Sequence, residues 1–109
     1  MKVTVICTLR VEGIHKWAGC PIEDVSFLKL PHRHIFHIKV WKKVGHLDRE
    51  TEIITLKRRI RQHIGSEPVD FVNQSCEEIA VWLINNFDLD AAEVLEDGEN
   101  GAYVEKSSE

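Results

Sequence analysis

The chain has 109 residues, which is the size of a single domain. Its 14 Lys and Arg residues against 18 Asp and Glu residues give a formal net charge of -4, so a nucleic acid is not an expected partner, because nucleic-acid-binding surfaces are normally basic. No apolar run has the length of a membrane span. The cysteines Cys7, Cys20 and Cys76 are odd in number and lack C-x-x-C spacing, which favours reduced thiols in a cytoplasmic protein.

The first half of the chain predicts two long strands. Residues 2–12 alternate between β-branched or apolar side chains and polar ones, and this period of two is typical of a strand. His15 falls just past the end of this strand, and residues 16–31, rich in glycine and proline, are expected to form a long loop. The alternation returns at His32 and continues up to Gly45, which indicates the second strand.

Two helices are expected to follow. Residues 49–64 carry apolar side chains at helical spacing with basic residues between them, and Gly65 stands where a helix stop belongs. Ser75 and Glu78 have the spacing of a capping box, in which the serine caps the helix and the glutamate reaches back to it. The second helix is therefore predicted over residues 76–87.

The C-terminal part predicts a hairpin. Strands at residues 91–96 and 102–105 flank a cluster of turn formers, and residues 106–109 are expected to form a frayed tail. The order of elements is then strand, strand, helix, helix, strand, strand. This order predicts one α+β domain over residues 1–105, an antiparallel four-stranded sheet with two helices on one face.

Three histidines form the most informative chemical pattern. His32 and His34 are one residue apart on a predicted strand, so their side chains point to the same face of the sheet. Two imidazoles on one face need a third ligand to form the catalytic kind of zinc site, in which three neutral imidazoles leave an open position. His15, at the end of the preceding strand, is the candidate for this third ligand.

Four stretches of the chain resemble the 6-pyruvoyl- and 6-carboxytetrahydropterin synthases, whose architecture is the T-fold. They occur in the family's order and cover most of the chain: Val11-Glu12-Gly13-Ile14-His15, Pro31-His32-Arg33-His34-Ile35-Phe36, the helix start from Gln74 to Trp82, and Glu96 with Asn100, Ala102 and Tyr103. The resemblance implies a zinc ion held by His15, His32 and His34. It also implies substrate-binding roles for Ser75, at the helix start, and for Glu96, whose carboxylate can accept two parallel hydrogen bonds from a pterin or guanine ring.

The chain departs from the family at the catalytic positions. The family's catalytic cysteine stands four residues before the first histidine of the pair, and this position is Leu28 here. The nearest counterpart of the family's Asp-His pair is Asp70, but Phe71 follows it. Cys20 is a candidate replacement, since a thiolate beside a metal can act as base or nucleophile, and Glu23 is another, since a carboxylate can act as a general base.

The resemblance implies a function and an assembly. The expected activity is that of a zinc-dependent lyase acting on a dihydroneopterin-triphosphate-like substrate, on a route to tetrahydropterins or to 7-deazaguanines such as queuosine. The alternative is a protein that keeps the zinc ion and binds a pterin or purine-like ligand without the lyase reaction. In either case a homo-oligomer is expected, a tetramer or hexamer in which strands of neighbouring copies close a barrel, with Glu96 contributed to sites between subunits.

Overall fold

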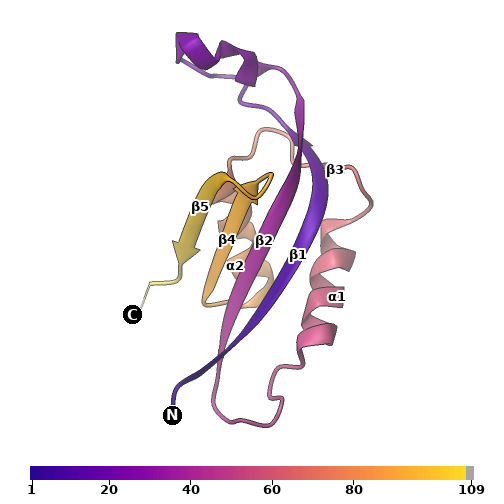
Figure 1. Cartoon of the computed structure of the whole chain (residues 1–109), viewed down its shortest axis with the longest axis vertical. Helices are drawn as coiled ribbons and strands as arrows, with labels where there is room; N and C mark the ends of the chain where they lie inside the picture. The colour runs from indigo at the N-terminus through magenta and orange to yellow at the C-terminus, as the bar shows by residue number, and fades with distance from the viewer. Residues whose placement is uncertain (108–109) are drawn as a thin grey trace.

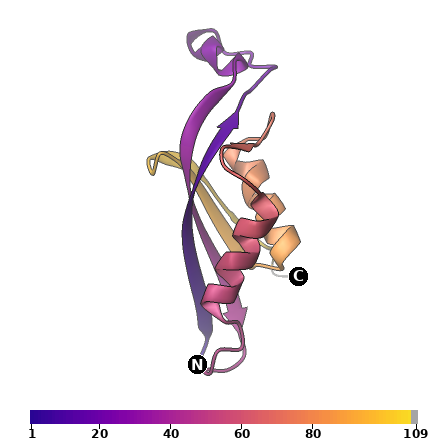
Figure 2. The ribbon, with the colours of Figure 1, turned by 90° about the vertical axis from the view of Figure 1, so that its right-hand side faces the viewer.

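The computed structural model describes residues 1–107 and shows two helices packed on one face of a curved sheet (Figures 1 and 2). Along the chain the elements are β1 (Val3–His15), the 3-10 helix η1 (Glu23–Lys29), β2 (His32–Val44), α1 (Ile53–Ile64), β3 (Val69–Asp70), α2 (Cys76–Phe87), β4 (Ala91–Glu96) and β5 (Asn100–Glu105). The strand order in the sheet is β3-β1-β2-β4-β5. The predicted α+β order is confirmed, and the two-residue strand β3, too short to give a sequence period, makes the sheet five-stranded.

β1 and β2 form a long antiparallel hairpin that extends beyond the rest of the sheet and carries η1 at its tip (Figure 1). Its pairing runs from Val3 opposite Val44 to His15 opposite His32. β1 thus ends three residues later than predicted, because its last residues pair with β2 on one side and, in parallel, with β3 on the other. These tertiary hydrogen bonds leave no trace in the local alternation.

The helices begin and end at local capping signals. α1 starts at Ile53 rather than at residue 49, because the Glu52 carboxylate accepts the backbone N–H groups of Ile54 and Thr55, each at 2.9 Å. The capping box of α2 is present as predicted: the Ser75 hydroxyl accepts from the Glu78 N–H at 3.1 Å, and the Glu78 carboxylate accepts from the Ser75 N–H at 3.0 Å.

The hydrophobic core lies between the sheet and the two helices. Its largest fully buried side chains come from β2 and β4, from the inner faces of the helices and from the connection between α2 and β4: Phe36, Ile38, Val40, Val94, Ile60, Ile79, Leu83 and Leu89. Full burial of each such side chain contributes about 1.5–3 kcal/mol. At the upper end of this core, the Phe36 ring contacts the rings of His15, His34 and Phe71 edge to face. The core thereby forms a rigid floor beneath the histidines.

The β4–β5 hairpin has a tight turn centred on Asp97 and Gly98, which both have positive φ, 56° and 74°. The Glu99 N–H donates to the Glu96 carbonyl at 3.0 Å, which closes the turn, and β5 starts at Asn100, two residues earlier than predicted. In the β2–β4 pairing, Glu96 lies opposite Phe36. Because directly paired residues share a face of the sheet, Glu96 projects on the same side as Phe36 and, two residues apart along β2, as His34.

Two further sequence expectations concern the loop and the C-terminus. The predicted loop at residues 16–31 is irregular apart from η1. Of the predicted tail, Lys106 donates its backbone N–H to the Asp90 carbonyl at 2.8 Å, and residues 108–109 lie outside the described part of the chain. Neither helix within residues 1–107 combines the length and apolar character needed to cross a membrane.

A candidate metal centre and its cavity

The structure brings His15, His32 and His34 together at the end of the β1–β2 hairpin where the strands lead into the loop that carries η1. His15 and His32 are directly paired across the strands, and His34 follows on the same face of β2. The three rings are 4.5 to 5.4 Å apart, centroid to centroid. Together with Glu96, they offer four ligand atoms that all lie within 4.8 Å of one another. This group of four residues is called the His3Glu cluster below.

Each histidine of the cluster is oriented by a partner at its Nδ1 atom. The partners are the Gln74 carbonyl at 2.8 Å from His15, the Leu30 carbonyl at 2.9 Å from His32, and the Asp97 carboxylate at 2.7 Å from His34. Carbonyl and ionised carboxylate oxygens only accept hydrogen bonds, so each Nδ1 carries the proton. In the neutral rings the Nε2 atoms then present lone pairs, which is the arrangement that metal-binding histidines adopt.

Two of these lone pairs are buried without a hydrogen-bond partner. The Nε2 atoms of His15 and His34 lie 2.9 and 3.5 Å from the two oxygens of Glu96, yet neither makes a hydrogen bond. In this tautomer a ring nitrogen and a carboxylate oxygen are both acceptors, so their proximity without a proton between them is unfavourable. Buried acceptors facing one another are stabilised by a positive charge between them, supplied either by protonation of the ring, which makes an ion pair with Glu96, or by a bound metal ion. Three imidazoles and one carboxylate are donors that suit Zn²⁺, so the residues fit the expected metal.

Glu96 lies beside the histidines of its own chain, and not in a position that would require a neighbouring copy. The tight β4–β5 turn and the pairing of Glu96 with Phe36 place its carboxylate over the end of β2. From the sequence, Glu96 is expected to reach a site across a subunit interface, whereas here it lies beside the histidines of its own chain. Its position is set by the strand register, which the sequence does not display.

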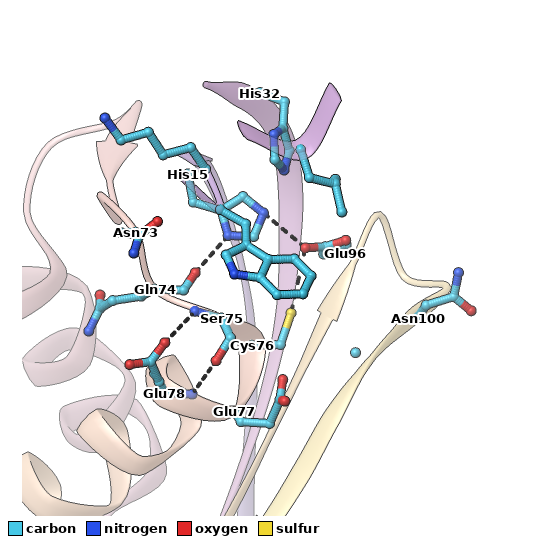
Figure 3. A pocket seen from close by; sticks show the side chains of 14 residues that line it. His15, His32, Asn73, Gln74, Ser75, Cys76, Glu77, Glu78, Glu96 and Asn100 are labelled. Carbon is cyan, nitrogen blue, oxygen red and sulfur yellow. Dashed lines mark hydrogen bonds and ion pairs between the residues drawn. The ribbon is translucent and has the colours of Figure 1, made fainter. Parts of the chain in front are cut away.

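A cavity of about 480 Å³ opens next to the His3Glu cluster (Figure 3). This volume falls in the range of small-molecule sites. Its walls come from the end of β1 and the following loop, from the start of α2 and the segment before it, and from the β4–β5 hairpin: His15, Lys16, Trp17, Leu28, His32, Asn73, Gln74, Ser75, Cys76, Glu77, Glu78, Glu96, Asn100 and Gly101. A ligand in this cavity would lie beside His15, His32 and Glu96.

The three predicted catalytic residues lie away from this cavity, whereas Leu28 is part of its wall. The buried Cys20 thiol points to the carbonyls of Ile22 and Val25 within its own loop. Glu23 is exposed in the first turn of η1, and Asp70 accepts the Val72 N–H at 2.8 Å and so stabilises a bend. For Cys20 and Glu23, proximity along the sequence did not bring the side chains to the histidines, because the hairpin tip directs this part of the loop outward (Figure 2).

Ser75 and Cys76 form the part of the cavity wall contributed by the start of α2. The Ser75 hydroxyl serves as the helix cap, as the capping box requires. The Cys76 thiol lies 3.8 Å from Glu96 Oε2 and donates to it. Burial, followed by the negative charges of Glu96 and Glu77, raises the pKa of Cys76 to about 12, so the thiol keeps its proton. Sequence reasoning missed this cysteine, because only the packing of α2 against β4 brings it to Glu96.

Asp97 is the second functional residue that the sequence did not single out. Hydrogen bonds from the Ile35 N–H and from His34 hold the pKa of its carboxyl below the usual value. In the sequence, Asp97 belongs to a cluster of turn formers, which is a sufficient reason for an aspartate at this position. Its contact with a histidine 63 residues earlier is a product of the tertiary structure.

The long two-stranded hairpin, the pair of helices on one face and the second hairpin together define a T-fold, as predicted from the sequence. No protein-family model matches the chain, and no curated protein matches it. Among solved structures, the 6-pyruvoyl tetrahydropterin synthase of Caenorhabditis elegans is similar, with a TM-score of 0.72 over 98% of this chain and 97% of that chain. The two sequences are 15% identical, so the likeness establishes the shared fold.

Proposed function

We propose that this chain is a zinc-dependent protein of the pterin-synthase type, which binds a reduced pterin at the His3Glu cluster and acts on it as a lyase. The observation that carries the proposal is the pair of buried, unpartnered Nε2 atoms on His15 and His34, which face the Glu96 carboxylate. This arrangement is unfavourable in the absence of a cation and favourable with one. The similar fold of 6-pyruvoyl tetrahydropterin synthase supports a pterin as the ligand.

Different residues of the cavity would bind different parts of the ligand. Zn²⁺ held by the three histidines would supply a Lewis acid for the oxygens of the ligand's side chain. With the zinc ion held by the three histidines alone when a ligand is bound, both oxygens of Glu96 would be free to accept the parallel N–H groups of a pterin or purine-like ring, because a carboxylate matches two adjacent donors. The half-exposed Trp17 in the cavity wall offers an apolar surface for the ring.

The alternative is a protein that binds the ligand without the lyase reaction. A specific observation favours it: the cavity wall has Leu28 at the position of the family's catalytic cysteine, and Cys20, Glu23 and Asp70 lie elsewhere. A lyase needs a group that moves the carbon-bound proton. In the metal-free protein the thiol of the cavity, Cys76, is protonated.

The metal part of the proposal is tested by elemental analysis of the purified protein. We expect close to one zinc ion per chain, and loss of this zinc in His32→Ala. A matched control is His46→Ala, because the His46 side chain is 58% exposed and lies in the loop after the far end of β2, away from the cluster. Zinc retained by His32→Ala at the level of His46→Ala would refute the assignment.

The ligand and the reaction are tested together by incubating zinc-loaded protein with dihydroneopterin triphosphate and analysing the products. Turnover supports the lyase, and binding without turnover supports the alternative. Binding is measured by tryptophan fluorescence, with Glu96→Gln as the test variant and Glu99→Gln as the control on the neighbouring turn. Equal affinity of Glu96→Gln and the parent protein would contradict the anchoring role of Glu96.

We also propose that the chain assembles into a homo-oligomer, a tetramer or hexamer, in which β5 pairs with a neighbouring copy and the sheets close a barrel. β5 is an edge strand, and edge strands are normally covered or paired. The sheet face opposite the helices carries Ile6, 47% exposed, and Tyr103, 52% exposed, whose ring packs against Trp41. Light scattering after size-exclusion chromatography tests this, and a monomer at micromolar concentration would refute it.

A further inference from the structure

Asp97 connects the β4–β5 turn to β2 through three hydrogen bonds. Its carboxylate Oδ2 lies 2.7 Å from His34 Nδ1, and its Oδ1 accepts the Ile35 N–H at 2.9 Å. Its own backbone N–H donates to the Ile35 carbonyl at 2.8 Å. One side chain therefore satisfies two donors on consecutive residues of β2, and both of its oxygens are used.

The backbone of Asp97 is in the left-handed region, with φ of 56°. This conformation costs most L-residues about 1–2 kcal/mol, while aspartate, asparagine and glycine tolerate it best. The following residue, Gly98, also has a positive φ of 74°, as a tight hairpin turn of this type requires. The turn conformation directs the Asp97 side chain back towards β2. Glu96, the preceding residue, lies beside it.

His34 differs from the other two histidines in the partner that orients it. His15 donates to the backbone carbonyl of Gln74 and His32 to that of Leu30. A side-chain substitution at Gln74 or Leu30 does not remove these carbonyls. Within the described residues, His34 is the member of the cluster whose Nδ1 is held by a side chain. The orientation and tautomer of His34 are thus under the control of a single replaceable group.

We propose that Asp97 is a positioning residue that fixes the Nδ1–H tautomer of His34 and thereby sets the affinity of the His3Glu cluster for zinc. The inference rests on the proposed zinc site. A carboxylate that accepts from the distal nitrogen of a ligating histidine holds the ring in place and increases its basicity, and its loss commonly weakens metal binding about 10- to 100-fold. Asp97 also links the ligand His34 to Glu96, because Asp97 follows Glu96 in the chain and its carboxylate bonds to His34 and Ile35 on β2.

The substitution Asp97→Asn separates this role from the role in the turn. Asparagine tolerates the positive φ, and its amide oxygen can still accept the Ile35 N–H. Its NH₂ group then faces His34 Nδ1, which has to become an acceptor, so the proton moves to Nε2 and the lone pair directed at the metal is lost. A flipped amide would instead set its NH₂ against the Ile35 N–H, so neither orientation replaces the carboxylate.

A second variant guards against a failure to fold. Asp97→Gly suits the backbone conformation and removes the carboxylate without placing a donor against the ring. The control is Asp48→Asn, since Asp48 is exposed and pairs with the neighbouring Arg49 away from the cluster. Thermal unfolding of each metal-free variant shows whether the fold is retained.

Zinc affinity is measured by competition with a chromogenic chelator. We expect a Kd about 10- to 100-fold higher for Asp97→Asn and Asp97→Gly and unchanged for Asp48→Asn. A Kd for Asp97→Asn within twofold of the parent value would overturn the proposal.

The tautomer is read from ¹H–¹⁵N NMR spectra of the His34 ring in metal-free protein, which do not depend on zinc. We expect the Nδ1–H form in the parent protein and the Nε2–H form in Asp97→Asn, a change that a purely structural role would not produce. An Nε2–H form in the parent refutes the positioning role. If the parent shows the Nδ1–H form but takes up no zinc, the proposed metal site fails, and the role of Asp97 in zinc affinity fails with it.

Discussion

The packing beneath the candidate metal centre leaves no room for an added methyl group at Gly13. Gly13 lies opposite His34 in the β1–β2 pairing. A Cβ atom at Gly13 would lie 2.5 and 2.7 Å from two carbons of the Phe71 ring and 2.9 Å from Phe36. Favourable carbon contacts are about 3.5–4.0 Å, so Gly13→Ala is short by roughly 1 Å against two rings.

These two rings have little room to move. Phe36 is fully buried and contacts the rings of His15 and His34, and the Phe71 ring packs against Phe36. Overpacking in such a core typically costs about 1–3 kcal/mol. For a domain of this size each kcal/mol lowers Tm by about 4–8 °C. Gly13→Ala should therefore unfold several degrees below the parent, and its zinc affinity should fall because the floor under the histidines shifts.

The assay is urea and thermal unfolding of metal-free protein, with Gly19→Ala as the matched control. A Cβ at Gly19 would meet nothing within 4 Å, so this variant should stay within about 0.5 kcal/mol of the parent. Adding Phe71→Leu to Gly13→Ala should recover part of the loss, as a double-mutant cycle would show. Equal stability of Gly13→Ala and Gly19→Ala would refute the overpacking argument.

Two further predictions concern helix α2. Ser75→Ala removes the acceptor of the Glu78 N–H and should lower the free energy of unfolding in urea by about 1 kcal/mol. The control Ser66→Ala, in an exposed loop, should leave this free energy unchanged. A Ser75→Ala protein as stable as the parent would contradict the capping argument. Lys42, by hydrogen bond and charge, holds the pKa of the exposed Asp88 carboxyl below 3.8. A lowered folded pKa stabilises the protein above the unfolded value, and the gain is lost as pH falls through the folded pKa. Asp88→Asn should therefore be less stable than the parent at neutral pH, and the difference in stability should disappear below about pH 3.8 in a series of melting curves. A difference that does not change with pH would contradict this argument.

Much of the site could be predicted from local sequence patterns. The period of two in β2 places His32 and His34 on one face, and the capping box at Ser75 places the start of α2. These features depend on residues close together in the chain, where backbone geometry dictates which side chains are neighbours. The four motif stretches, taken in order, also predicted the T-fold that the similar solved structure shares.

The residues that surround the histidines were not predictable in the same way. Cys20 and Glu23 precede His32 closely in sequence, but the hairpin tip directs them away from the cavity. Cys76 and Asp97 lie more than forty residues from any histidine of the cluster and reach it through the packing of α2 and the turn of the β4–β5 hairpin. Distance along the sequence is therefore a poor guide to which side chains line the cavity.

The sequence by itself determined the element order, the face of β2 that carries two histidines and the caps of α2, because each follows from interactions between residues a few positions apart. Only the tertiary structure decided that His15 meets His32, that Glu96 faces the histidines of its own chain, and that Asp97 orients His34. These three contacts depend on strand register and on the direction of the turn between β4 and β5. Register is set by the summed burial and pairing of whole strands, a property that no short stretch of sequence contains.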